Sequence, residues 1–447
     1  MLGAVVAVPA GACYKGLLRV TSHMRWPLST SASGSIDVSR PRDLVTPIQV
    51  VAWTYAAWLF ALTIVSQGRG SLVVQEIVLL SGVVPALLQT AMLPSDTRGS
   101  ASGLWFMVAF VTVFLASLLA NETRWVDLAN VINVIFVFMI GFVVASCDDT
   151  SLIRRILAKY ALLTAPYLLY INLFGAYEWG RLKAGSQPNL WGLIALNVAV
   201  GAFCLRNRLL AGACWAIVLL TMYNAQTRGS MVALVPVIGL AGYMWWRYSQ
   251  QMDLSWKVLA VIAALFAAMF VLVAQPDFFI NNVMRLNDPY RGLQSGMTGR
   301  DTAWNEALRI WYGSPILGVG FRRHEYFMVF TQLNAHNAYL AMLADAGILG
   351  LTVYAMMIVM SFFAALRIGG DHRIRLLIVA ILLCYGLVGM FERRAINVGN
   401  SLSIVFIFAC LTALRLSRVP MAATLSQPMA AAPAVHATVP TLQSVAP

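Results

Sequence analysis

The chain has 447 residues, of which 60% are hydrophobic and only 11% are charged. Soluble domains carry about 25% charged residues, so this composition excludes a soluble protein. Apolar runs of about 18 residues or more recur along the chain, and each predicts a transmembrane helix. Because backbone polar groups must be satisfied internally in lipid, these uniform runs indicate helices, whereas a membrane β-barrel would show alternating segments of about ten residues.

Hydropathy predicts an all-α polytopic membrane protein with about twelve transmembrane helices. In chain order the predicted spans are 45–66, 70–93, 101–120, 128–147, 156–175, 189–205, 208–224, 229–246, 256–274, 346–367, 374–391 and 400–416. One long polar-containing stretch separates the ninth span from the tenth, and it predicts a large loop at the membrane surface.

The positions of lysine and arginine predict the topology. The net charge is +13, from 31 Lys and Arg against 18 Asp and Glu, and basic residues accumulate in the short loops of one side, which is then cytoplasmic. The predicted organisation is a cytoplasmic leader (1–44), nine spans (45–274), a loop domain on the outer side (275–345), three spans (346–416) and a disordered cytoplasmic tail (417–447). Both termini are expected in the cytoplasm.

The helix after the loop is too long for a single straight span. Residues 336–366 would extend about 46 Å as an α-helix, whereas the hydrocarbon core is about 30 Å thick. The sequence therefore predicts a short helix at the outer surface, a break near Gly347–Gly350, and then the tenth span.

The loop itself contains a second predicted helix. Trp304, Leu308 and Trp311 recur at helical spacing, Asp301 can cap the start, and Pro315 follows the end. This pattern predicts an amphipathic helix lying at the membrane interface.

Arginines on the outer side of this topology are the candidate phosphate-binding groups. The positive-inside rule predicts few of them there, yet Arg181, Arg228 and Arg300 stand beside turns or helix starts. A single outer arginine is more often a solvated cation. As a set they indicate an anionic ligand, because the guanidinium binds phosphate through a planar fork and the helix start beside Arg300 also favours an anion. A pyrophosphate fits these requirements.

His336 is the candidate general base. The chain has five histidines, and a lone histidine is usually structural. His336, however, stands at the entrance of a long apolar helix with Asn337 beside it as a supporting residue. Histidine ordinarily titrates near neutrality, so it can accept a proton from a hydroxyl. His324 is the alternative base, although it lies on an exposed-looking stretch beside Arg322, Arg323 and Glu325.

Several catalytic signatures are missing from the sequence. It has no Walker A loop, no outer Asp-x-Asp pair, no Gly-x-Ser-x-Gly elbow and no Cys/His cluster with zinc spacing. We therefore expect no metal and no other cofactor. No carboxylate pair is placed as in a glycosidase, and the opposite charges at Glu392, Arg393 and Arg394 could simply pair with one another.

The late part of the chain resembles the O-antigen ligase family of bacterial polysaccharide enzymes, which also includes polymerases and protein-glycan ligases. The resemblance rests on Gly299, Arg300, Trp304, Ala307, Pro315, Gly318, Val319, Gly320, Phe321, His336, Asn337, Ala338, Tyr339, Leu340, Gly347, Gly350 and Leu351. It implies a fold similar to C-type glycosyltransferases. It also implies that His336 is the family's histidine, Arg300 its loop arginine and Arg228 its earlier span-end arginine, while Arg181 loosely matches a third.

The resemblance implies a reaction in lipopolysaccharide biosynthesis at the bacterial inner membrane, with the active site facing the periplasm. A glycan on undecaprenyl pyrophosphate would be transferred to a hydroxyl of the lipid A–core oligosaccharide. The expected partners are these two substrates and membrane lipids, with no nucleic acid. Arginines could neutralise the leaving pyrophosphate without a metal. A single displacement would invert the anomeric carbon, since no nucleophilic carboxylate is identified.

Two alternatives remain open. The chain could be a polysaccharide polymerase or a protein-glycan ligase of the same superfamily, because the acceptor is not visible in the sequence. It could instead be a transporter of an anionic lipid or sugar, which would need charged residues at mid-span depth. Most predicted spans have uncharged centres, and Glu76 is an exception without an explanation.

Overall fold

The structure is a computed structural model that describes residues 46–67, 72–95, 101–121, 124–178, 180–184, 187–248, 300–328, 335–369, 371–393 and 399–418. The expectations for the leader, for the ninth span at 256–274, for the loop up to residue 299 and for the tail from residue 419 lie outside these ranges.

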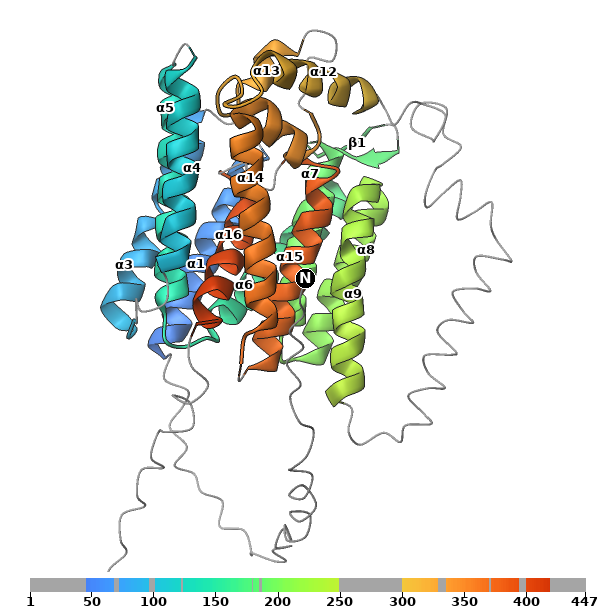
Figure 1. Ribbon diagram of the computed structural model, residues 1–447. Helices are drawn as coiled ribbons and strands as arrows, with labels where there is room; N and C mark the ends of the chain where they lie inside the picture. Colours follow the sequence, from blue (N-terminus) through green and yellow to red (C-terminus); the bar gives the residue numbers. More distant parts are fainter. Residues whose placement is uncertain are drawn as a thin grey trace, which may run out of the picture. The chain divides into compact units, whose positions relative to one another are not determined.

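The described chain is a bundle of helices with one short hairpin (Figure 1). The helices before residues 249–299, which the structure does not describe, are α1 (Pro47–Val65), α2 (Leu72–Leu80), α3 (Val83–Met92), α4 (Ala101–Leu119), α5 (Trp125–Ser146), α6 (Leu152–Phe174), α7 (Pro188–Phe203), α8 (Arg208–Ala225) and α9 (Arg228–Tyr248). Those after these residues are α12 (Arg300–Gly313), α13 (His324–Phe327), α14 (Ala338–Leu366), α15 (His372–Gly389) and α16 (Ser401–Leu416). The antiparallel hairpin joins β1 (Tyr177–Glu178) to β2 (Arg181–Leu182).

The predicted class of an all-α multi-pass membrane protein is confirmed. Within the described ranges, seven helical segments are long and apolar enough to cross a membrane, and four shorter apolar helices accompany them. These segments coincide with eleven of the predicted spans. The total of about twelve stays a prediction.

The second predicted span is interrupted between α2 and α3. The indole N–H of Trp58 donates to the carbonyl of Val78 at 2.8 Å. Gly82, whose N–H would bond to that carbonyl in a continuous helix, bonds to Leu79 at 3.1 Å instead. A side chain inserted into the helix ladder is a recognised cause of a break.

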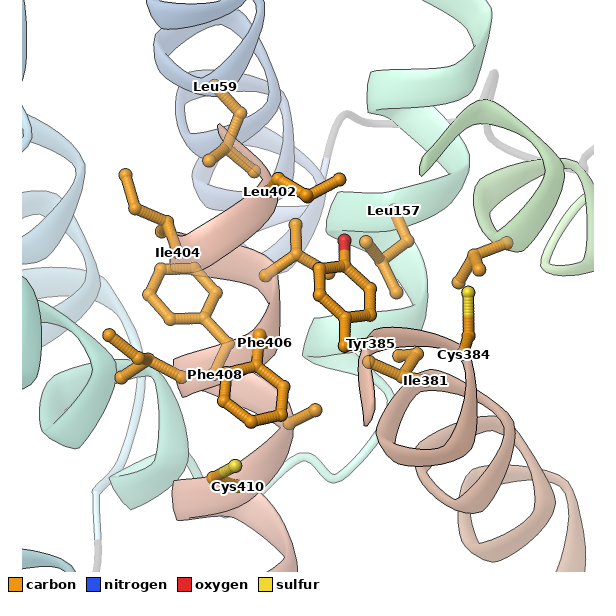
Figure 2. Close-up of a cluster of buried hydrophobic side chains, with 14 of the residues drawn as sticks. Leu59, Leu157, Ile381, Cys384, Tyr385, Leu402, Ile404, Phe406, Phe408 and Cys410 are labelled. Carbon is orange, nitrogen blue, oxygen red and sulfur yellow. The ribbon is translucent and has the colours of Figure 1, made fainter. Parts of the chain in front are cut away.

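α16 is the centre of the bundle. Its residues from Ser401 to Leu414 are all buried, and it packs against α1, α4, α5, α14 and α15. A helix that is apolar on every side belongs in a core. Figure 2 shows Phe406 and Phe408 of α16 among side chains of α1, α6 and α15, and the Phe406 ring stacks on Tyr385 with centroids 5.6 Å apart.

The predicted break in α14 is confirmed at Gly347, which has φ +64° and ψ −165° inside an otherwise helical segment. The carbonyls of Ala344 and Asp345 then lack their helical partners. They accept hydrogen bonds from the N–H groups of Val319 (3.0 Å) and Gly320 (2.9 Å). The segment after α12 thus supplies the backbone partners that an interrupted membrane helix requires.

α12 confirms the helix predicted in the loop and lies with α13 across one end of the bundle, the same end as the hairpin (Figure 1). We call this end the loop end. The predicted apolar side chains Trp304, Leu308 and Trp311 are only half-buried. The buried side chains of α12 are Ala303, Glu306, Ala307 and Ile310. Small residues on that face let α12 approach α14 closely.

Replacing Gly347 with alanine should destabilise the protein. Its backbone conformation is essentially restricted to glycine, and such strain costs about 1–3 kcal/mol. An added Cβ would also lie 2.1 Å from the carbonyl oxygen of Ile316. We expect Gly347→Ala to lower the melting temperature in detergent. Gly212→Ala is the matched control, because nothing lies within 4 Å of a Cβ built there. Equal melting temperatures for the two variants would contradict the strained break.

Candidate functional site

Glu392 is the centre of a polar cluster at the loop end. Its Oε1 accepts a hydrogen bond from the Asn189 amide at 2.6 Å and lies 3.7 Å from Nη2 of Arg300. Its Oε2 lies 3.7 Å from Nδ1 of His336. The Glu392 side chain is only 10% exposed. A nearly buried carboxylate therefore gathers groups from three separate parts of the chain.

The turn after α15 holds Glu392 in place. The N–H groups of Phe391 and Glu392 both bond to the carbonyl of Val388, at 2.9 and 2.8 Å. The Met390 carbonyl accepts from the Asn337 amide at 3.3 Å. Phe391 packs so closely on Gly229 that a Cβ there would lie 2.8 Å from the Phe391 Cβ. The starts of α9 and α14 are thereby fixed beside the Glu392 carboxylate.

Four described helices begin around this cluster. Asn189 is the second residue of α7, Arg228 is the first of α9, Arg300 is the first of α12, and His336 stands two residues before α14. Helix N-termini carry N–H groups without intrahelical partners and a partial positive charge. The partial charges of these helix starts and the full positive charge of Arg300 therefore lie at the loop end, an arrangement that favours an anion.

His336 is held in a conformation that directs its ring to the cluster. Its φ is +44°, which is uncommon for a residue with a Cβ and is found at functional sites. The next residue, Asn337, caps α14 by accepting hydrogen bonds from the N–H groups of Tyr339 (2.9 Å) and Leu340 (3.0 Å). The cap fixes the backbone of His336, whose side chain is 16% exposed.

Arg181 lies on β2, the second strand of the hairpin, and contacts Asn189. Its guanidinium donates to the carbonyls of Ala225 (3.0 Å) and Gln226 (3.4 Å) and to Oδ1 of Asn189 (3.3 Å). The first two bonds cap the end of α8, where carbonyls lack helical partners. Arg181 therefore supports the cluster through Asn189 and positions the turn that leads into Arg228.

The five residues proposed from sequence thus lie at the same end of the bundle. Arg300 and His336 contact Glu392 directly, and Asn337 bonds to the turn that carries it. Arg181 reaches it through Asn189. Arg228 adjoins Gly229, which packs on Phe391.

Glu392 and Asn189 were not among the residues proposed from sequence. The sequence left open that the charges at 392–394 pair with one another, and the structure gives Glu392 and Arg393 other partners. Arg393 forms an ion pair with Glu325 instead, and Glu392 turns toward Arg300 and His336. The sequence feature that could have identified Glu392 is its place as an acidic residue directly after a predicted span, among basic neighbours on the predicted outer side.

The alternative base, His324, does not lie in an exposed stretch as expected. Its side chain is fully buried, and its Nδ1 lies 2.8 Å from Oδ1 of Asp345. The N–H of His324 donates to the same oxygen at 2.9 Å. This pair ties α13 to the broken part of α14. A buried, hydrogen-bonded histidine of this kind has a structural role.

Arg322, Arg323 and Glu76 belong to a second polar network along α5. Arg323 lies 3.7 Å from Asp127, and Arg322 donates to Asn130 at 3.0 Å. Burial lowers the pKa of Arg322, and the charges of Asp345, Tyr326 and Glu76 oppose that effect. Glu76 itself accepts a hydrogen bond from Asn133 at 3.0 Å.

This network accounts for the acidic residue in the second predicted span. Glu76 is partnered by α5 and stands near the positive charge of Arg322. Charged side chains in a membrane helix pair in this way when they face protein. Glu76 therefore has a structural explanation that does not require a transport pathway.

A segment in the middle and late part of the chain matches a known family. Residues 213–355 match the family model described as O-Antigen ligase. The exopolysaccharide production protein ExoQ of Rhizobium meliloti (strain 1021) is 24% identical over 249 residues, which cover 49% of this chain and 55% of the relative. The chain thus spans about half the length of this curated relative. The family match contains Arg228, Arg300 and His336, whereas Arg181 and Glu392 lie outside it.

Proposed function

We propose, from the match of residues 213–355 to the O-Antigen ligase family model and the similarity to ExoQ, that the chain is an inner-membrane glycosyltransferase whose donor is a glycan on undecaprenyl pyrophosphate. The proposed acceptor is a hydroxyl of the lipid A–core oligosaccharide. The loop end would then face the periplasm, where both lipids present their sugars.

The observation that carries this proposal is the convergence of the starts of α7, α9, α12 and α14 on one charged cluster. A pyrophosphate carries several negative charges and leaves readily once they are neutralised. Prearranged N–H groups and arginines in a partly buried site neutralise such charge effectively. Arg300 and Arg228 start two of these helices, so their guanidinium groups can meet the same anion.

His336 would supply the base. Its Nδ1 is turned toward Glu392, so Nε2 is the nitrogen that would take the proton of the acceptor hydroxyl. The acceptor oxygen then bonds to the anomeric carbon while the bond from that carbon to the pyrophosphate oxygen breaks. The electron pair leaves with undecaprenyl pyrophosphate, and the anomeric configuration is inverted.

A polymerase is the second candidate. The relative in Rhizobium meliloti is named for exopolysaccharide production, which favours an acceptor that is itself a growing glycan. The two functions share the donor site and differ only in the acceptor hydroxyl.

Purified protein should transfer glycan from undecaprenyl pyrophosphate to lipid A–core without added nucleotide. We expect the rate to persist in EDTA, because arginines and helix N-termini neutralise the leaving group in this proposal. Product formation is followed by gel mobility and mass spectrometry. Chains lengthened without lipid A–core would identify a polymerase. Loss of transfer in EDTA with recovery in magnesium would count against the proposed site.

His336→Ala should lower transfer by about 10²–10⁴-fold, the usual contribution of a general base. Donor binding and folding should be retained, because Asn337 rather than His336 caps α14. His324→Ala is the contrasting variant. It should lower the melting temperature by removing the imidazole that contacts the buried Asp345 carboxylate, while turnover per folded molecule changes little. If His324→Ala lost turnover while His336→Ala only lowered the melting temperature, His324 would be the base and His336 the structural residue.

Replacing either Arg300 or Arg228 with lysine should lower kcat/KM for glycan transfer. Lysine keeps the positive charge but loses the planar fork that grips a phosphate with two parallel hydrogen bonds. One lost charge-assisted hydrogen bond corresponds to about 10–100-fold in kcat/KM. Initial rates over a range of donor concentrations measure this effect. Full turnover in both Arg300→Lys and Arg228→Lys would show that neither side chain clamps the pyrophosphate.

A further inference from the structure

Glu392 stands where the proposed donor's anion would bind. The two oxygens of its carboxylate are divided between partners: Oε1 meets Arg300 and Asn189, and Oε2 meets His336. A carboxylate that is 10% exposed needs such partners, because an isolated buried charge costs several kcal/mol. Glu392 is therefore an anion already placed in an anion-binding site.

A pyrophosphate entering the same site would meet this carboxylate as a like charge. Like charges in a poorly solvated site repel strongly and do not share one cation without cost. The donor must therefore take Arg300 from Glu392, and binding becomes an exchange of one anion for another.

The geometry fits an exchange of this kind. Strong charge-assisted hydrogen bonds from nitrogen to a carboxylate are about 2.7–2.9 Å long, whereas the Arg300 and His336 contacts are both 3.7 Å. The carboxylate is shared loosely between two partners. Once Arg300 turns to the donor, Glu392 retains His336, and a small rotation of the carboxylate can shorten that contact.

The retained contact has a catalytic consequence. His336 gains a positive charge when it accepts the acceptor's proton, and a carboxylate at Nδ1 stabilises that charge and fixes the ring so that Nε2 faces the hydroxyl. Carboxylates that orient a histidine in this way are a recurrent feature of acid–base catalysis.

We propose that Glu392 holds Arg300 and His336 before the donor binds, yields Arg300 to the donor pyrophosphate, and then positions His336 for proton transfer. This inference rests on the proposed function. It makes Glu392 a positioning residue that opposes donor binding and promotes turnover.

Glu392→Gln tests these two opposite effects in one variant. Glutamine keeps the shape and can still accept from Asn189, but it removes the charge. We expect undecaprenyl pyrophosphate to bind about fivefold more tightly, because one like charge is gone, measured by thermophoresis of the detergent-solubilised full chain. We expect kcat for transfer to fall by about 10–100-fold. A residue that only supported the fold would weaken binding and turnover together.

Glu392→Asp and a double variant complete the test. Aspartate restores the charge, so donor affinity should return to the wild-type value and kcat should recover in part. Adding Glu392→Gln to His336→Ala should lower kcat no further, because Glu392 acts through His336. Asp301→Asn is the matched control, since Asp301 is exposed in the first turn of α12 beside Arg300. It should leave kcat unchanged and donor affinity within about twofold.

The outcomes separate this inference from the proposed function. A wild-type protein that neither binds undecaprenyl pyrophosphate nor transfers glycan would overturn the function itself. A wild-type protein that does both, with a Glu392→Gln variant that binds no more tightly or turns over normally, would overturn only the role of Glu392. Equal tightening in Asp301→Asn would also overturn it, by showing a general effect of charge. If Glu392→Gln does not fold, Glu392→Asp serves as the test. Wild-type kcat together with weaker donor binding in Glu392→Asp would then overturn the proposed role of Glu392.

Discussion

The hydrogen bonds across the break in α14 are the constraint on which the loop end depends. The carbonyls of Ala344 and Asp345 must find donors, because an unsatisfied backbone group in a membrane protein costs several kcal/mol. Val319 and Gly320 supply those donors. These bonds hold the segment between α12 and α13 against the break in α14, and the Asp345 side chain contacts His324. The same break therefore organises both the backbone and the nearby charges.

Charges at the loop end serve two different purposes. Around α5, arginines and carboxylates are matched in a buried network that joins α13 and α2 to the bundle. Around Glu392, one carboxylate is shared by the Arg300 guanidinium, the His336 imidazole and the Asn189 amide. The first arrangement joins elements of the fold, and in the proposed function the second releases Arg300 to an anion. Arginine content alone does not distinguish these roles, whereas the partners of each arginine do.

The family match and the geometry of the cluster bear on different levels of function. The match runs from residue 213 in α8 to residue 355 in α14, and it shows similarity to the O-Antigen ligase family over that segment. The cluster around Glu392 extends beyond that match to the hairpin, α7 and the turn after α15. In the proposed function, donor recognition is thus assembled from the matched segment together with neighbours that the match does not contain.

Local features of this protein could be predicted from its sequence. Membrane spans, the break at Gly347 and the helix that became α12 all depend on hydropathy, chain length, glycine or helical spacing within a few turns. The helix starts that carry Arg228, Arg300 and His336 are local features of the same kind.

Which charges meet was decided only by the tertiary structure. Asn189 and Glu392 are 203 positions apart yet share a hydrogen bond, and the neighbours Glu392 and Arg393 form ion pairs with different distant residues, Arg300 and Glu325. His324 has charged neighbours in sequence but is fully buried against Asp345. Electrostatic partners are chosen by distance in space and by burial, and helix packing sets both. The sequence around each residue therefore indicates its chemical type, while the packing of distant helices determines its partner.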